Sequence, residues 1–146
     1  MAAKRSVFVE WIWRIHLRLY EWSGGRIGAS LMGLPVLLLT TTGRRSGQPR
    51  TSPLMYLPRG DDFVVIASYL GEPRHPFWWT NLVANPGASV QIGSRQYRVT
   101  AREAEGKERE DLWKAVVAKT PDYDEYQKRT TRRIPVVVLE RAKEKA

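Results

Sequence analysis

Three arginines and two glycines lie in one short segment that contains no acidic residue. Residues 40–50 read TTTGRRSGQPR, and no Asp or Glu occurs between Thr40 and Gly60. Glycines let the backbone turn its N–H groups into a concavity, and arginine side chains match phosphate or carboxylate oxygens. The segment therefore predicts a binding site for an extended polyanion. A solvated basic hairpin tip has the same composition, and neither the Walker pattern nor GxGxxG is present.

A second candidate combines a polar strand end with an aromatic helix. A β-rich run ends in Ala67 and Ser68, and Pro76 opens a helical stretch that carries Trp78, Trp79 and Asn81. The unpaired N–H groups at a helix start can bind a ring carbonyl or a phosphate. Tryptophans in such a stretch are nevertheless more often core anchors, and an asparagine there can simply satisfy nearby backbone.

A third candidate is a pair of tyrosines. Tyr123 and Tyr126 are three residues apart after Pro121, so a short helix would place both phenols on one face. They could cover a flat substrate and supply a proton. Ordinary half-buried tyrosines have the same spacing, so this pair alone decides nothing.

Composition excludes several other chemistries. The chain has 146 residues and no cysteine, which excludes disulfides, thiolate nucleophiles and thiolate metal sites. Its two histidines, His16 and His75, lack metal-ligand spacing, so we expect no metal site. An enzyme of this composition would rely on an organic cofactor. The net charge of +9 predicts partners rich in phosphate or carboxylate, such as nucleic acid, anionic lipid or a phosphorylated cofactor.

The elements that must position these residues alternate between strands and helices. Runs rich in Val, Ile, Thr and Tyr predict strands at residues 35–42, 51–58, 62–68, 89–92, 96–103 and 134–140. Short joins between neighbouring runs indicate antiparallel pairing. Helices are predicted at residues 76–84, at residues 107–119 and around the two tyrosines. The chain is therefore expected to form one α+β domain whose strands curl into a small barrel.

The first part of the chain predicts an amphipathic helix. Apolar residues recur at helical spacing over residues 6–22, with cations around them. Such a helix could pack on the core, or residues 4–26 could lie at a lipid interface. Charges interrupt any membrane-spanning or signal segment. We therefore expect a cytoplasmic protein that could be peripheral at the inner face of the cell membrane.

Four segments, taken in order, resemble one protein family. They are LLLTTTGRRSGQPRTSPLMYL, FVVIAS, HPFWWTNLVANP and TPDYDEYQKRTTRRIPVVVLE, which lie between residues 37 and 140; the resemblance covers roughly residues 34–140. The pattern resembles the deazaflavin-dependent nitroreductases of actinobacteria, also described as F420H2-dependent quinone reductases. The resemblance implies a split β-barrel of about six antiparallel strands, with an N-terminal helix and two to three flanking helices. We expect an N-terminal amphipathic helix and lead-in at residues 1–33, and a split-barrel deazaflavin-binding domain at residues 34–146 that is one folding unit.

The same resemblance implies coenzyme F420 and a set of site residues. The phosphate and polyglutamate tail would be held by Arg44, Arg45, Ser46 and Arg50. The strand beside the deazaflavin would supply Thr51, Ser52, Pro53, Leu54 and Met55. The strand end at the ring would supply Ile66, Ala67, Ser68 and Tyr69. The helix that closes the site would supply Phe77, Trp78, Trp79, Thr80 and Asn81. Ser68, Tyr123 and Tyr126 would serve the chemistry.

The implied reaction is hydride transfer from reduced F420 to a small planar electrophile: a quinone, a nitroaromatic or an activated enone. The protein would contribute mainly proximity and alignment. Family members often have a lysine where Tyr69 stands, and some have tyrosines where Met55 and Thr120 stand. We therefore expect quinones to be better acceptors than bulky nitroimidazoles.

Two rival interpretations remain open from the sequence. A basic small barrel with six tryptophans could bind nucleic acid, although its aromatics cluster in apolar helical segments rather than beside Lys and Arg on strands. A split barrel could also bind flavin mononucleotide or haem. Titration with each cofactor decides the second alternative. Oligonucleotide affinity that falls steeply with salt, without deazaflavin binding, would favour the first.

Overall fold

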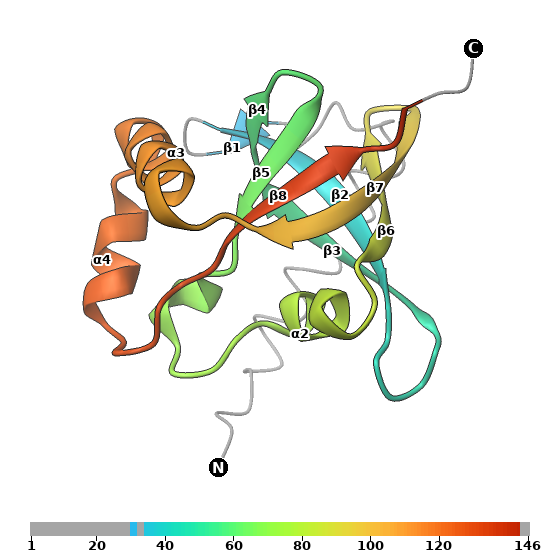
Figure 1. Cartoon of the computed structure of the whole chain (residues 1–146), viewed down its shortest axis with the longest axis horizontal. Coiled ribbons are helices and arrows are strands. Elements are labelled where there is room, and N and C mark those ends of the chain that lie inside the picture. Colours follow the sequence, from blue (N-terminus) through green and yellow to red (C-terminus); the bar gives the residue numbers. More distant parts are fainter. Residues whose placement is uncertain (1–29, 32–33, 144–146) are drawn as a thin grey trace.

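The computed structural model of the chain describes residues 30–31 and 34–143 (Figure 1). The expected N-terminal helix, residues 6–22, and the expected lipid contact, residues 4–26, lie outside these residues. Among the described residues, no helix has both the length and the apolar character needed to cross a membrane.

Eight strands, three α-helices and one short 3-10 turn make up the described part of the chain. In chain order they are β1 (Ser30–Leu31), β2 (Leu34–Thr42), β3 (Pro49–Met55), β4 (Leu57–Arg59), β5 (Asp62–Ile66), η1 (Tyr69–Gly71), α2 (Phe77–Ala84), β6 (Gly87–Ile92), β7 (Arg95–Glu103), α3 (Gly106–Lys119), α4 (Asp122–Lys128) and β8 (Val136–Arg141). The helices predicted at residues 76–84 and 107–119 and around the tyrosines are therefore confirmed. β1 lies before the expected domain boundary at residue 33, and it pairs with β2.

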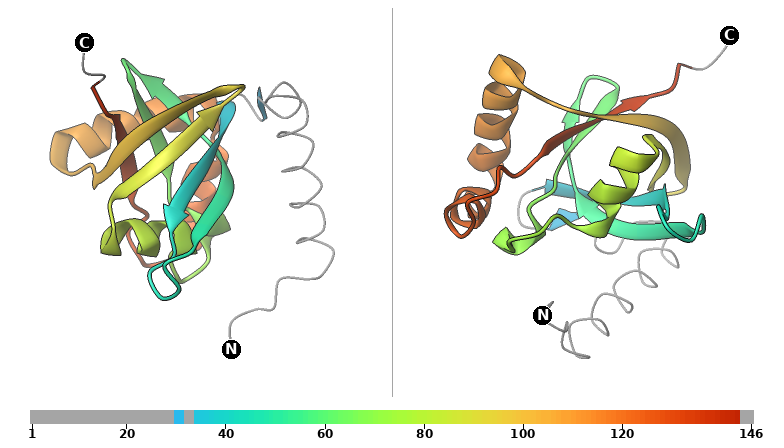
Figure 2. Two further views of the ribbon diagram at one scale, coloured as in Figure 1. Left: turned by 90° about the vertical axis from the view of Figure 1, so that its right-hand side faces the viewer. Right: turned by 60° about the horizontal axis from the view of Figure 1, so that its bottom comes forward.

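The strands form one antiparallel sheet that curls into a barrel (Figures 1 and 2). The hydrogen-bonded order is β1-β2-β6-β7-β8-β5-β4, and β3 pairs with β2. Only Tyr56 separates β3 from β4, so the two form one bent strand that passes from β2 to β5. With this bent strand counted once and the two-residue β1 set aside, six antiparallel strands enclose the interior. The predicted small barrel is confirmed.

The bend at Tyr56 is the main difference from the predicted strand at residues 51–58. Its backbone N–H donates to the Pro35 carbonyl at 2.9 Å. Its ring is buried and packs edge-on against Phe63, with ring centroids 5.6 Å apart. Because Tyr56 turns inward here, β3 stays with β2 while β4 joins β5. β3 therefore pairs with a strand on one side only, within the described residues, and leaves the barrel split along that edge.

Two apolar clusters stabilise this arrangement on opposite sides of the sheet. The barrel interior contains Leu37, Leu39, Tyr56, Phe63, Val65, Ala67, Trp78, Trp79, Leu82, Val90, Val99, Val137 and Leu139. The outer cluster lies between the sheet and the helices α3 and α4, and it contains Leu34, Val64, Ile66, Ala104, Leu112, Val116, Tyr123, Ile134, Val136 and Val138. β5 and β8 contribute to both clusters, which explains their continuous apolar runs.

Candidate functional site

The predicted site segments meet at one end of the barrel. The loop between β2 and β3, the turn η1 and the helix α2 all lie at the lower end in Figure 1, and α4 lies beside η1. The opposite end carries the β4–β5 and β6–β7 turns. Segments that are far apart in the sequence therefore share one end of the fold.

The segment at residues 43–50, called the arginine hairpin below, joins β2 to the first two residues of β3 and is held closed by its own backbone. The Gly43 N–H donates to the Gln48 carbonyl at 2.8 Å, and the Gly47 N–H donates to the Gly43 carbonyl at 2.8 Å. Gly47 has a φ of +71°, which glycine adopts without strain. Arg44, Arg45 and Arg50 are exposed, and no ion pair found in the described part of the chain involves them. Their guanidinium groups are available to an external anion.

Asn81 connects helix α2 to the arginine hairpin. Its side-chain oxygen accepts the Arg44 backbone N–H at 3.1 Å, and its side-chain nitrogen donates to the Thr41 hydroxyl at 3.1 Å. Asn81 and Thr41 are both buried. Asn81 was predicted to contact the cofactor, and this geometry gives it a positioning role for the hairpin, while its contact with a coenzyme stays a prediction.

The expected ring-binding strand, β3, lies on the split edge of the barrel. Thr51 is exposed and its hydroxyl lies 2.8 Å from that of Thr40. Ser52, Pro53, Leu54 and Met55 are half-buried. Because β3 pairs only with β2 among the described strands, its outer backbone edge faces the split. A flat ring could lie along this edge.

The other expected ring-binding segment ends in a left-handed turn. The predicted strand at residues 62–68 stops at Ile66, and positive φ values follow at Tyr69 (44°), Leu70 (56°) and Gly71 (78°). Two successive non-glycine residues at positive φ are uncommon, and backbone strain of this kind is concentrated at functional sites. Ser68 precedes them, is buried and has right-handed φ and ψ. A right-handed residue before a left-handed one turns consecutive N–H groups toward a common point.

Helix α4 packs directly against this turn. A Cβ atom on Gly71 would lie 2.6 Å from the Tyr126 carbonyl oxygen, so only glycine allows the close approach. Tyr126 is half-buried, and its ring meets that of Tyr123 edge-on with centroids 5.8 Å apart. Tyr123 is only 5% exposed, and burial raises the pKa of its phenol, with smaller contributions from Tyr126 and Asp122. Tyr126 is therefore the more accessible phenol, and the catalytic roles of both tyrosines stay predictions.

Helix α2 divides its aromatic residues between the core and the surface. Trp78 and Trp79 are 7% and 8% exposed and belong to the interior cluster, as their alternative interpretation as core anchors predicted. Phe77 is 67% exposed at the start of the helix. Thr80 is half-buried, and its hydroxyl donates to the Phe77 carbonyl at 3.0 Å. Phe77 is thus the aromatic residue of α2 that an external ring could touch first.

Arg132, to which no role was predicted from the sequence, joins the segment after α4 to the strand-end turn, residues 67–72. Its guanidinium donates to the carbonyls of Ala67, Ser68 and Glu72, at 3.1, 2.7 and 2.8 Å. Burial lowers its pKa. The only sequence signal was a pair of arginines, Arg132 and Arg133, directly before a buried strand.

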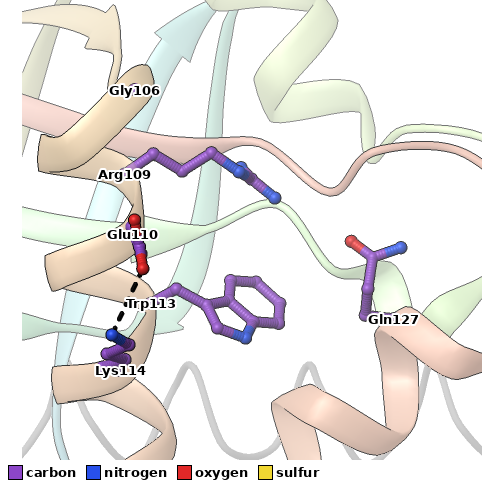
Figure 3. Close-up of a pocket in the computed structure, with 6 residues that line it drawn as sticks. All are labelled: Gly106, Arg109, Glu110, Trp113, Lys114 and Gln127. Atoms are coloured by element: carbon purple, nitrogen blue, oxygen red, sulfur yellow. Dashed lines mark hydrogen bonds and ion pairs between the residues drawn. The ribbon is translucent and has the colours of Figure 1, made fainter.

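Two pockets on the described part of the chain lie away from these residues. One, shown in Figure 3, lies beside Trp113 between α3 and α4 and has a volume of about 300 Å³. The other lies near Arg102 and has a volume of about 360 Å³. Neither pocket is lined by a predicted site residue. Within the described residues, no group of three His, Cys, Asp or Glu side chains could hold a metal ion.

Known proteins share the sequence and the fold of this chain. The sequence matches the family described as F420H(2)-dependent quinone reductase over residues 11–141. An F420H(2)-dependent quinone reductase of Mycobacterium tuberculosis is 42% identical over 132 residues, which cover 88% of this chain and 89% of the relative. The structure of an F420H2-dependent reductase, FDR-A, is 47% identical with a TM-score of 0.67, and the match covers 73% of this chain and 94% of that one.

A more distant structure shares the fold alone. The haem storage protein HutZ of Vibrio cholerae has a TM-score of 0.54 at 16% identity, with 75% of this chain and 82% of that chain covered. The barrel described above is therefore a split β-barrel. The family match and the close relatives together show that the chain belongs to the F420H2-dependent quinone reductase family, and that it is an oxidoreductase whose cofactor is reduced coenzyme F420.

Proposed function

We propose that this reductase binds F420 across the end of the split barrel and passes its hydride to a quinone. The observation that carries the proposal is the arginine hairpin, whose three exposed arginines have no acidic partner among the described residues. The hairpin lies at the same end as the left-handed strand-end turn. One end of the fold thus offers cations for a polyanionic tail and backbone donors for a ring.

The donor set fits the coenzyme. Arg44, Arg45 and Arg50 provide charge for the phosphate and the carboxylates of the tail. Ser46 also lies in the hairpin, where its hydroxyl accepts the Gln48 N–H at 3.1 Å and can still donate to an anion. Thr51, Ser52, Pro53, Leu54 and Met55 would line one side of the ring. Ile66, Ala67, Ser68 and Tyr69 would line the other, and Phe77, Trp78, Trp79, Thr80 and Asn81 would close the site.

When bound, the reduced deazaflavin supplies a hydride to an electrophile stacked on its face. The chain's residues bind and align the partners, which can account for much of the rate. We assign the proton supply to the hydroxyl of Ser68 or to the phenol of Tyr126, with Tyr123 as the buried support of that phenol. No acidic or basic side chain is required at the reacting atoms.

A quinone is the acceptor that this site fits best, and nitroaromatics or activated enones are further candidates. The exposed Phe77 and Leu70, which is 61% exposed, place apolar surface beside the proposed ring site. A flat apolar acceptor would be favoured by this surface. Tyr69 adds bulk at this position without a positive charge.

Stopped-flow oxidation of F420H2 by menadione tests the activity. The proposal predicts acceleration over buffer by the unchanged protein, and a clear loss when Arg44 and Arg45 are both replaced by alanine. Lys143, which is exposed just beyond the end of β8, provides a control for the loss of a surface cation as Lys143→Ala. No acceleration over buffer would contradict the proposed reaction.

We also propose that residues 4–26 contact a membrane surface and that residues 34–146 form the folding unit that binds the coenzyme. Co-sedimentation with vesicles of anionic lipid tests the first point. Loss of sedimentation on removal of residues 1–26 supports it, and unchanged sedimentation contradicts it. The second point predicts that this shortened chain, which keeps β1, still binds F420.

A further inference from the structure

We propose that Arg132 is a positioning residue that fixes the direction of two backbone donors at the ring site. This inference rests on the proposed placement of the F420 ring beside the strand-end turn. It concerns a residue that contacts neither the ring nor the acceptor in that placement.

One guanidinium group holds three carbonyls of this turn. The Arg132 Nη1, Nη2 and Nε atoms donate to the carbonyls of Ala67, Ser68 and Glu72, at 3.1, 2.7 and 2.8 Å. Nη1 also lies 3.1 Å from Nδ1 of His75. An arginine has five N–H donors in a rigid planar fork, so one side chain can hold several carbonyls in fixed directions.

The direction of these carbonyls determines where the adjacent N–H groups point. In a trans peptide the C=O and the following N–H point in opposite directions, and no cis peptide occurs in the described residues. Since the Ala67 and Ser68 carbonyls point at Arg132, the N–H groups of Ser68 and Tyr69 point to the opposite side of the turn. That side is away from β8, because the Ala67 N–H donates to the Pro135 carbonyl at 3.0 Å. The two donors are thus directed toward the split edge of the barrel.

The turn needs such a clamp because its backbone is strained. Tyr69 and Leu70 have positive φ values, which cost a non-glycine residue free energy unless the surroundings fix them. Arg132 is itself held in place: its carbonyl accepts the Gln127 side-chain nitrogen at 2.8 Å, and the Gln127 oxygen accepts the Ile134 N–H at 3.0 Å. Helix α4 therefore supports the clamp, and the clamp sets the orientation of the Ala67–Ser68 and Ser68–Tyr69 peptides.

The test compares Arg132→Met with Arg133→Met. Arg133 is the adjacent, exposed arginine, and no hydrogen bond or ion pair of its side chain is found among the described residues. We expect Arg132→Met to weaken F420 binding and to lower kcat by roughly tenfold each, as loss of directed donors implies. KM for menadione should stay unchanged, because the acceptor does not touch the clamp. Arg133→Met should behave as the unchanged protein, and Arg132→Lys should recover part of the loss.

A second measurement needs no variant and so does not depend on how well Arg132→Met folds. In ¹⁵N-labelled unchanged protein, F420 should shift the amide resonances of Ser68 and Tyr69. Binding that leaves both amides unmoved, or an Arg132→Met protein with unchanged F420 affinity and kcat, overturns this inference alone. Failure of the unchanged protein to bind F420 removes the proposed function and this inference with it.

Discussion

Replacing Asn81 with leucine should loosen the arginine hairpin from helix α2. The change removes the acceptor of the Arg44 N–H and the donor to the Thr41 hydroxyl, both at 3.1 Å. Thr41 is 2% exposed, so water cannot readily replace the lost partner. A buried polar group left unsatisfied costs about 1–3 kcal/mol, whereas the Arg44 N–H, closer to solvent, should cost only about 0.5–1 kcal/mol. We expect the free energy of unfolding to fall by about 2–3 kcal/mol.

Thr41→Val tests whether the loss of stability comes from the hydrogen bond between Asn81 and Thr41. In the unchanged protein it removes a hydroxyl that hydrogen-bonds to Asn81, which should cost about 1 kcal/mol. In the Asn81→Leu background the same hydroxyl has already lost that bond, so its removal should be neutral or stabilising. The double-mutant cycle should therefore show coupling of about 1 kcal/mol or more.

Urea unfolding followed by tryptophan fluorescence measures these changes, because Trp78 and Trp79 lie in the core. Asn85→Ala is the matched control: its side-chain oxygen accepts the Gly87 N–H at 3.2 Å in an exposed position, and its loss should cost less than about 1 kcal/mol. F420 affinity should fall with Asn81→Leu and stay unchanged with Asn85→Ala. Additive effects of Thr41→Val and Asn81→Leu would refute the proposed bridge.

Three further predictions concern the turn and the charged groups. Gly71→Ala should destabilise the protein by at least about 1 kcal/mol more than Gly60→Ala, because both glycines have positive φ but only Gly71 faces a close backbone neighbour. Thermal unfolding compares the two variants, and equal losses of stability would count against the packing of α4 on the turn. The hydrogen bond to Arg102 lowers the pKa of Glu108, so this exposed pair should stabilise the protein by less than about 1 kcal/mol. The stabilisation should be present above the ordinary glutamate pKa and lost as pH falls through the lowered pKa of the folded state. A loss of stability in Glu108→Gln that persists in acid would contradict this. Burial, and to a smaller extent the charge of Arg132, lower the pKa of His75, so the protein should lose stability as pH falls through the unfolded histidine pKa of 6.5. This loss should be absent in His75→Gln, and an equal pH dependence of stability in both proteins would show that His75 does not cause it.

The helices and strands were predicted well from the sequence, but the way in which the sheet closes into a barrel was predicted only in part. Residues 63–66 alternate between the two apolar clusters, so their run of apolar residues identified a strand buried on both faces. The bend at Tyr56 gave no sequence signal, because an inward-facing tyrosine fits an ordinary strand equally well. The strand end after Ile66 was also placed too late, since the left-handed conformation occurs at Tyr69 and Leu70 rather than at glycines alone.

The candidate site likewise contains residues that the sequence identified and one, Arg132, that it did not. The arginine hairpin was recognisable because three arginines without a nearby acid form a local pattern. Arg132 was not, since its role depends on carbonyls that lie about 60 residues away along the chain. Backbone carbonyls exist at every position, so no residue type marks the ones that a distant arginine will bind.

The most direct test of the central claim compares two ligands: F420 and the deazaflavin chromophore without its phosphate and glutamate tail. Quenching of tryptophan fluorescence gives the affinity of each ligand for the unchanged protein and for the variant with Arg44, Arg45 and Arg50 replaced by alanine. We predict that the unchanged protein binds F420 more tightly than the tail-free ligand, and that the variant binds both with similar, weaker affinity. If the unchanged protein binds neither ligand, or if the variant keeps the full preference for F420, the arginine hairpin does not hold the coenzyme.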